Sequence, residues 1–292
     1  MNSTSGMSHN ENDFDCFRAE LNEADFRQFS DYIYEQFGIK MPDIKRVMLQ
    51  GRLLKRIREL KMKSYTEYKE YFFSPKGQRE ELLNFLSVVT TNKTDFFREP
   101  VHFDFLQHEA LPEFKAQGQR EVKIWSAACS SGEEPYTIAM VVSEFLEQNP
   151  SAGMSYSILG TDISTNVMQK ASRGVYPEKA VTMIPLDIKR KYFLKSKDRT
   201  NPTVHISPAL QRNFSLQYLN LMDEVYDIKG EFDVIFCRNV LIYFDRATQE
   251  RVIQKLCTKL RKGGYIFIGH SESMANMDVP LTNIKPTIFK RI

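Results

Sequence analysis

Hydrophobic and polar positions change their spacing near residue 90 of this chain. Between residues 19 and 90, apolar side chains recur every three or four positions, as on one face of an α-helix. The helices predicted there cover residues 26–37, 44–60, 65–73 and 80–89. From about residue 91 to 292, short runs of β-branched and aromatic residues alternate with longer amphipathic stretches. The sequence therefore predicts a small all-α N-terminal domain over 19–90 and a doubly wound α/β domain over 91–292.

Two segments fall outside this division. Residues 1–18 are rich in Ser, Asn and acidic side chains and are predicted to be a disordered tail. Residues 175–212 interrupt the alternation with four prolines and short β-prone runs, which predicts a small β insertion. No apolar run approaches the ~20 residues that span a bilayer, and no secretory signal pattern opens the chain, so a soluble cytoplasmic protein is expected.

The segment over residues 122–146 predicts a ligand-binding turn. An apolar run ending at Trp125 leads into a series of small residues and Gly132, and Glu133 and Glu134 open the amphipathic stretch that follows. Such a strand–turn–helix presents backbone N–H groups to a nucleotide or nucleoside. The two acids would repel a pyrophosphate, which disfavours a nicotinamide cofactor. S-adenosylmethionine fits better, because it combines ribose hydroxyls with a positive charge.

Polar residues follow nearly every predicted strand of the α/β domain. After the first strand, strands are expected at 156–159, 214–219, 232–237 and 265–268. In open α/β sheets, ligands bind at the carboxyl ends of the strands, and an acid that closes the second strand holds ribose hydroxyls. Asp162 occupies that place, with the N-cap of the next helix as its alternative role.

Cysteine spacing excludes some chemistry. The four cysteines show no C-x-x-C spacing, so the sequence predicts neither a metal site nor a disulfide framework. Cys129 and Cys237 fall near the expected ligand edge of the sheet. They are predicted to be small apolar filler rather than nucleophiles, since no histidine is evidently paired with either.

The formal net charge of +3 conceals a basic segment. Residues 45–63 carry eight Lys or Arg against one Glu. Four of these cations share a stripe on the predicted helix: Lys45, Arg52, Arg56 and Lys63. The stripe is either a solvated face or a docking surface for an acidic partner, which would be nucleic acid, an anionic membrane or a Glu-rich helix.

Five segments together resemble the chemotaxis receptor methyltransferases, the CheR family. They are residues 90–99, 126–136, 160–164, 236–245 and 269–273, in the order in which the family has them, and the resemblance covers about residues 20 to 292. It implies a Rossmann-like methyltransferase sheet after a helical domain, with S-adenosylmethionine-dependent methylation of glutamate side chains on chemoreceptor cytoplasmic helices. It also favours an acidic receptor helix as the partner of the basic stripe.

The resemblance and side-chain chemistry together suggest a set of site residues. Arg98 is expected to grip the methionyl carboxylate of the cofactor bidentately, which a lysine does not reproduce. Glu133 or Glu134, with Asp162, is expected to hold the nucleoside, and the sequence leaves the choice between the two glutamates open. The resemblance adds the residues that line the rest of the pocket: Asn92, Thr94, Asn220, Leu221, Arg238 and Asn239.

The expected reaction needs little acid–base help. A glutamate carboxylate has a pKa near 4.3 and is already a nucleophile at neutral pH. The enzyme must align it with the methyl group and exclude water. Tyr243 is the candidate for aiming the carboxylate through a hydrogen bond, and packing in the apolar run 241–244 is its alternative role.

Two other functions stay open at the level of sequence. A nucleic-acid methyltransferase would use the same cofactor, although residues 238–241 lack the Asp/Asn-Pro-Pro-aromatic turn common in base amino-group methylation. A non-catalytic module that binds the cofactor would keep the fold without turnover. The sequence predicts no nucleic-acid partner and contact with the membrane only through the receptor. It does not decide whether the insertion docks on a receptor's C-terminal tail peptide.

Overall fold

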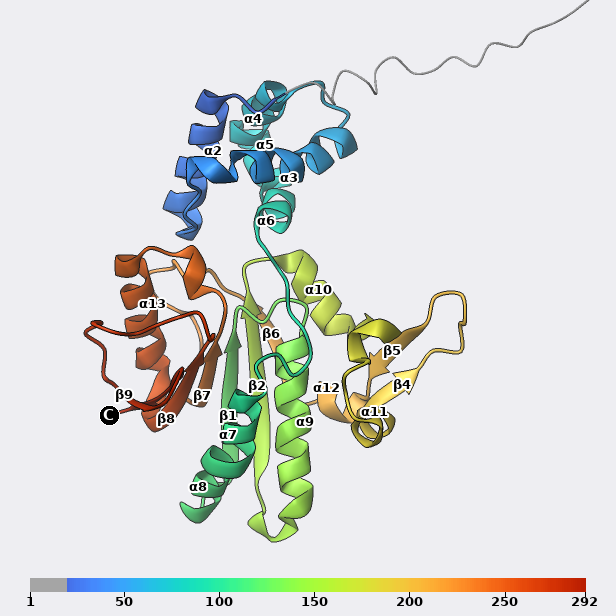
Figure 1. Ribbon diagram of the computed structural model, residues 1–292, viewed down its shortest axis with the longest axis vertical. Helices are drawn as coiled ribbons and strands as arrows, with labels where there is room; N and C mark the ends of the chain where they lie inside the picture. Colours follow the sequence, from blue (N-terminus) through green and yellow to red (C-terminus); the bar gives the residue numbers. More distant parts are fainter. Residues whose placement is uncertain (1–19) are drawn as a thin grey trace, which may run out of the picture. The chain divides into compact units, whose positions relative to one another are not determined.

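The computed structural model describes residues 20–292 (Figure 1), so the predicted disordered tail over 1–18 lies outside the described residues. The chain forms two compact units. The first consists of the described residues up to Gln36 together with Lys40–Thr91, and the second of Phe37–Ile39 together with Asn92–Ile292. In the part of the chain that is described, no helix is long and apolar enough to cross a membrane.

The first unit is entirely helical. Its helices are α2 (Glu23–Phe37), η1 (Asp43–Lys45), α3 (Arg46–Glu59), α4 (Tyr65–Phe73), α5 (Pro75–Glu80) and α6 (Leu82–Val89). Residues 74–77, whose composition indicates a turn, instead begin α5, because the Ser74 hydroxyl accepts a hydrogen bond from Gly77 N at 3.0 Å and Pro75 suits the first helical turn. The core is aromatic, with the Phe72 and Phe85 ring centroids 4.2 Å apart.

A buried ion pair joins α3 to α6 in this unit. The Arg56 guanidinium donates to both carboxylate oxygens of Glu81, at 2.7 and 2.8 Å, and Glu81 is 1% exposed. The Tyr68 hydroxyl donates to the same carboxylate at 3.0 Å. Arg52 of α3 likewise donates to the Val89 carbonyl at the end of α6. Two cations of the predicted basic stripe therefore hold the helices together, which the sequence alone did not indicate.

The second unit is built on a seven-stranded sheet. Its strands are β1 (Glu121–Ala127), β2 (Ser155–Asp162), β6 (Phe214–Tyr218), β7 (Phe232–Cys237), β8 (Leu260–Ile268), β9 (Leu281–Lys285) and β10 (Ile288–Arg291). Their order is β6-β2-β1-β7-β8-β10-β9, with parallel pairing from β6 to β8 and antiparallel pairing of β10 with both of its neighbours. The chain order reverses between β1 and β7, and such a switch point is where open α/β sheets bind ligands.

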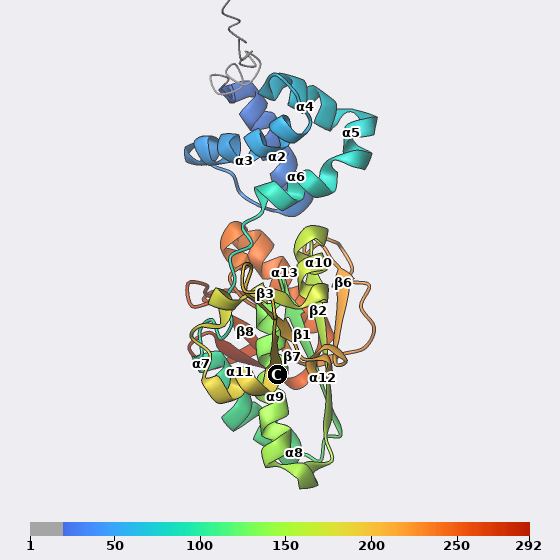
Figure 2. The same ribbon diagram turned by 90° about the vertical axis from the view of Figure 1, so that its right-hand side faces the viewer.

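Helices cover both faces of this sheet (Figure 1; Figure 2). They are α7 (Val101–Phe105), η2 (Leu106–Ala110), α8 (Leu111–Ala116), α9 (Glu133–Gln148), η3 (Pro150–Ala152), α10 (Thr165–Arg173), η5 (Leu241–Tyr243) and α13 (Arg246–Lys259). Along β7, Val234 and Phe236 join the core beneath α9, whereas Ile235 and Cys237 join the core beneath α13. A strand that is buried on both faces has a nearly continuous run of apolar residues. For this reason the sequence predicted a strand over residues 232–237.

The insertion folds as a separate antiparallel sheet in the order β3-β5-β4. It comprises β3 (Val175–Pro177), η4 (Glu178–Val181), α11 (Leu186–Tyr192), β4 (Phe193–Lys195), β5 (Thr203–Ile206) and α12 (Pro208–Gln211). The fold class is therefore confirmed: a doubly wound α/β sheet with a small β insertion, and an all-α unit ahead of it. The antiparallel β9 and β10 were not predicted, since β9 is mostly exposed and β10 has only two apolar residues before Lys290 and Arg291.

Removal of Arg56 should destabilise the helical unit. Arg56→Ala leaves the Glu81 carboxylate buried without its charge partner, which costs roughly 3 kcal/mol. Amide hydrogen exchange in α3 and α6 should accelerate by about a hundredfold. Lys55→Ala on the same helix serves as the control, because its ion pair with Glu59 is exposed. Equal protection in the two variants would contradict the structural role given to Arg56.

Candidate functional site

Left-handed backbone at residues other than glycine gathers around the switch point. Phe97 and Glu99 lie in the loop ahead of α7, with φ of 54° and 57°. Ala128 and Ser130 lie in the turn after β1, with φ of 66° and 50°, and Asn239 follows β7 with φ of 58°. Such conformations cost free energy and persist only where surrounding contacts enforce them, as they commonly do at functional sites.

Ala171 and Tyr176 pack closely against the turn after β1. Gly132 has φ of 96°, and a Cβ there would lie 2.8 Å from the Ala171 Cβ and 2.9 Å from the Tyr176 hydroxyl. Only glycine fits both the conformation and the space. The Ser130 N–H donates to Asp162 Oδ2 at 2.8 Å, which ties the turn to the end of β2. The backbone of the predicted ligand-binding turn is therefore held in one shape before any ligand arrives.

Asp162 lies where the sequence placed it, at the carboxyl end of β2. Its Oδ1 accepts from the Ser164 N–H at 2.9 Å, and its Oδ2 accepts from Ser130. Burial raises the pKa of this carboxyl above its usual range. The N-cap of α10 is Ser164 and not Asp162, so the alternative role is not the observed one. Each carboxylate oxygen of Asp162 retains acceptor capacity for a ligand hydroxyl.

Arg238 bonds to two other segments of the site. Its guanidinium donates to Glu134 Oε2 at 3.1 Å, to Glu99 Oε2 at 3.0 Å and to the carbonyl of Arg98. The side chain is 2% exposed, and its Nε has no hydrogen-bond partner in the described structure. Arg238 thus joins the end of β7 to the start of α9 and to the loop ahead of α7.

The two glutamates at the start of α9 have different surroundings. Glu134 accepts from the Ser126 hydroxyl at 2.6 Å as well as from Arg238, so its carboxylate is committed to the protein. Glu133 accepts from the Ser131 hydroxyl at 2.7 Å, and no cation of the described residues is bonded to it. Burial raises the pKa of both carboxyls, and Arg238 opposes that rise only at Glu134.

The loop over residues 92–100 contacts the turn after β1. The Asn92 carbonyl accepts from the Ser130 hydroxyl at 3.1 Å, and the Phe97 N–H donates to Thr137 on α9 at 3.2 Å. Arg98 is half-buried, and its guanidinium donates to the Lys93 carbonyl at 2.9 Å. Thr94 is half-buried in the same loop. The structure therefore brings Asn92, Thr94 and Arg98 to the switch point together.

Asn239 is positioned by a glutamate that the sequence analysis did not single out. Glu272 is 8% exposed, and its Oε2 accepts from the N–H groups of Asn239 at 3.0 Å and Gly269 at 2.5 Å. The Asn239 amide donates in turn to Glu99 Oε1 at 3.1 Å. A Cβ at Gly269 would lie 2.4 Å from Asn239 Nδ2, so the loop after β8 needs glycine there. Glu272 belongs to the motif over 269–273, but the motif alone does not show which backbone N–H groups donate to its carboxylate.

The remaining predicted site residues lie on neighbouring loops. Asn220 accepts from the Met222 N–H at 3.0 Å and so caps its own loop after β6, while Leu221 is buried in the core beneath α13. Tyr243 ends η5 and is half-buried, and its hydroxyl has no hydrogen bond within residues 20–292. The Ile242 N–H beside it donates to Glu272 Oε1 at 3.3 Å. The residue before Tyr243 is therefore linked to Arg238 through Glu272, Asn239 and Glu99.

Replacement of Glu272 should loosen the α/β unit. In Glu272→Gln, an amide NH₂ faces backbone donors that now bond to a carboxylate, which should lower the free energy of unfolding by about 1–3 kcal/mol. Trp125, the only tryptophan and fully buried in β1, reports unfolding of this unit by fluorescence in denaturant. The exposed neighbour variant Ser271→Ala should match the native chain. An unfolding midpoint for Glu272→Gln equal to that of Ser271→Ala would refute the positioning role.

Comparisons with known proteins agree with the motifs. Residues 92–289 match the SAM-binding domain of CheR methyltransferases, and residues 24–87 match the all-alpha domain of the same family. The chemotaxis protein methyltransferase of Borreliella burgdorferi is 35% identical over 289 residues, 98% of this chain and 100% of that protein. The Escherichia coli protein of the same name is 34% identical over 272 residues, 93% of this chain and 92% of its own. A probable chemotaxis protein methyltransferase of Rhizobium etli is 38% identical over 247 residues, 83% of this chain and 90% of its own. The resemblance found in the sequence is confirmed, and the chain belongs to the CheR methyltransferase family.

Proposed function

We propose that this chain transfers the methyl group of S-adenosylmethionine to glutamate side chains on chemoreceptor cytoplasmic helices, forming methyl esters in chemotaxis. Family membership makes it an S-adenosylmethionine-dependent methyltransferase of chemotaxis. The observation that supports the proposal most strongly is the acid-lined turn at the switch point, where Glu133 and Asp162 lie beside a fixed backbone. In the cell the enzyme would be cytoplasmic and would reach the membrane only through the receptor.

The donors and acceptors of the turn fit this cofactor. Glu133 and Asp162 supply acceptors for ribose hydroxyls, and neither is bonded to a cation in the structure. Of the two glutamates at the start of α9, we assign Glu133 to the ligand, because Glu134 is occupied by Arg238 and Ser126. When bound, S-adenosylmethionine supplies an electrophilic methyl group. The protein's task is then to position both partners.

Arg98 and Arg238 suit different tasks. Arg238 is fixed by two carboxylates and a carbonyl, so we assign it to holding the site together rather than to a ligand carboxylate. Arg98 uses its guanidinium for one backbone carbonyl and keeps donors for a bidentate contact with the methionyl carboxylate. The same pocket would be lined by Asn92, Thr94, Asn220, Leu221 and Asn239.

The reaction needs an aimed carboxylate and no general base. A substrate glutamate is ionised at neutral pH and attacks as it stands. Tyr243 offers a hydroxyl that no described residue binds, and it lies on the loop that Glu272 positions. We assign Tyr243 to a hydrogen bond with one substrate oxygen, which leaves the other oxygen to attack.

The helical unit would recognise the receptor through its basic surface. Lys63 is exposed, and Lys45 is half-exposed with its ammonium donating to the Lys40 carbonyl at 3.4 Å. Arg52 and Arg56 are half-buried, and their guanidinium groups bond to α6 and to the residues that flank it. We therefore give the first contact with an acidic receptor helix to the two lysines, and a supporting role to the two arginines. The edge strands β3 and β4 of the small sheet offer a surface on which a receptor's C-terminal tail peptide could add as a further strand.

The function is tested by transfer of labelled methyl from S-adenosylmethionine to chemoreceptor-rich membranes. Label should appear on the receptor and be released by mild base as methanol, which marks an ester. Arg98→Ala should weaken binding of S-adenosylhomocysteine by roughly a hundredfold, and Arg98→Lys should restore little, because lysine lacks the planar fork. Arg199→Ala, at an exposed position in the insertion, is the matched control. Base-stable label, or label on nucleic acid instead, would refute the proposal.

Charge reversal tests the receptor-binding surface separately from catalysis. Lys45→Glu combined with Lys63→Glu should slow receptor methylation several-fold at low salt, and the difference from the native chain should shrink as salt rises. Affinity for S-adenosylhomocysteine should not change. A control that alters net charge equally, Lys229→Glu with Lys262→Glu, should methylate at the native rate, since both lysines are exposed in the α/β unit. Equal slowing in both double variants would indicate a net-charge effect rather than a docking surface.

A further inference from the structure

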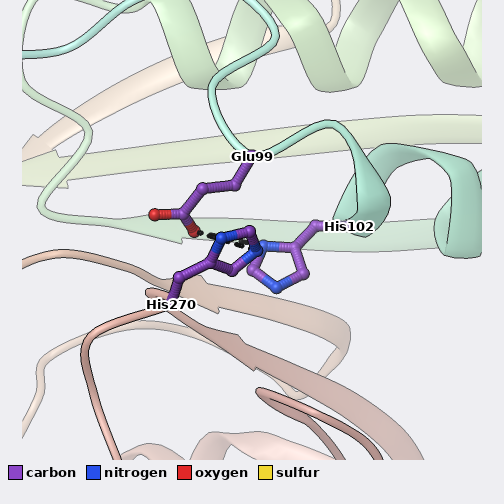
Figure 3. Close-up of side chains that lie close together, drawn as sticks. All are labelled: Glu99, His102 and His270. Atoms are coloured by element: carbon purple, nitrogen blue, oxygen red, sulfur yellow. Dashed lines mark ion pairs between the residues drawn. The ribbon is translucent and has the colours of Figure 1, made fainter.

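A cluster of metal-ligating side chains lies beside Arg238 and has no role in the proposed reaction. Glu99, His102 and His270 come from the loop ahead of α7, from α7 itself and from the loop after β8 (Figure 3). The three offer one ligand atom each within 4.8 Å of one another. His102 is fully buried, whereas the His270 side chain is 52% exposed. The cluster is therefore anchored in the core and open to solvent on one side.

The tautomer of His102 follows from its hydrogen bonds. The Thr287 hydroxyl donates to the Pro286 carbonyl at 2.6 Å, so it acts as acceptor toward His102 Nε2 at 2.8 Å. The ring proton then lies on Nε2, and Nδ1 carries a lone pair. That Nδ1 is buried and has no hydrogen-bond partner among residues 20–292, and it faces Glu99 Oε2 at 3.6 Å. Two electron-rich atoms therefore face each other across a gap.

We propose that Glu99, His102 and His270 form a binding site for one Zn²⁺-like transition-metal ion. Ligands that lie about 2.1 Å from a tetrahedral ion are separated from one another by about 3.4 Å. His102 Nδ1 and His270 Nε2 lie 3.6 and 3.9 Å from Glu99 Oε2, so small side-chain movements bring all three to bonding distance. A fourth position remains for water on the exposed side.

The surroundings of the cluster meet two further requirements of a metal site. A ligating histidine commonly donates its other N–H to a fixed acceptor, and Thr287 does this for His102. The local charge is also favourable, because the carboxylates of Glu99, Glu134 and Glu272 outnumber the single guanidinium of Arg238. Arg238 does bond to Glu99 Oε2, so the ion must share that oxygen with it. We therefore expect micromolar rather than nanomolar affinity.

Direct titration with Zn²⁺ tests the site without the cofactor, so its result is independent of the methyltransferase assignment. Calorimetry on the full chain, in thiol-free buffer, should show one ion bound per chain. The titration is made in a His9→Ala, Cys16→Ser background, which removes two ligand-type residues that lie outside the described part. Trp125 fluorescence in denaturant verifies the fold of each variant.

Two variants and one control test the cluster. His270→Ala removes an exposed ligand and should weaken Zn²⁺ binding more than about tenfold. Thr287→Val removes the acceptor for His102 Nε2–H and should weaken it about 10–100-fold, the usual effect of losing such a partner. His108→Ala, an exposed histidine on η2 outside the cluster, should bind as the background does. Failure of the background chain to bind Zn²⁺ up to millimolar concentration, or equal affinity in His270→Ala and His108→Ala, would overturn the proposal.

Discussion

The buried guanidinium of Arg238 is the interaction on which the candidate site depends. It joins three segments that are distant in sequence: the loop with Glu99, the start of α9 with Glu134, and the end of β7. A guanidinium at this depth is costly to desolvate, and two carboxylates and a backbone carbonyl offset that cost by bonding its two terminal nitrogens. Lysine could not replace it, since one ammonium cannot reach acceptors in that planar arrangement.

This cross-link explains where the backbone is strained. Glu99 and Asn239 both have positive φ, and the Asn239 amide donates a hydrogen bond to Glu99. The Asn239 backbone N–H donates to Glu272. The turn after β1 is enforced separately, by Asp162 and by the close approach of Ala171 to Gly132. The free energy cost of these conformations is thus offset by contacts that exist without a ligand. A site prepared in this way does not need to order itself when a ligand binds.

The same network links the site to the histidine cluster. Glu99 Oε2 is shared by Arg238, His102 and His270, so an ion that bonds this oxygen would compete with Arg238. Occupancy of the cluster would then alter the loop that carries Arg98. In the helical unit, Arg56 and Glu81 form a comparable buried pair, which shows that cations in a basic sequence segment can be structural rather than free for a partner.

The sequence by itself determined the layers of the fold and the general place of the site. The periodicity of apolar residues predicted the helices of the first unit. Apolar runs that end in polar residues predicted the five parallel strands, because a strand buried on both faces has consecutive apolar residues. For the same reason, Asp162 could be placed at the end of a strand, and the two acids of α9 at the start of the helix that follows the turn. The sequence did not show the different bonding of Glu133 and Glu134, the ion pair of Arg56, or the contacts of Glu99, Glu272 and His102. These depend on contacts between residues up to about 140 positions apart, such as Arg238 with Glu99. Only the tertiary structure decided them, because a side chain's partner is set by where the folded backbone places it and not by its neighbours in the chain.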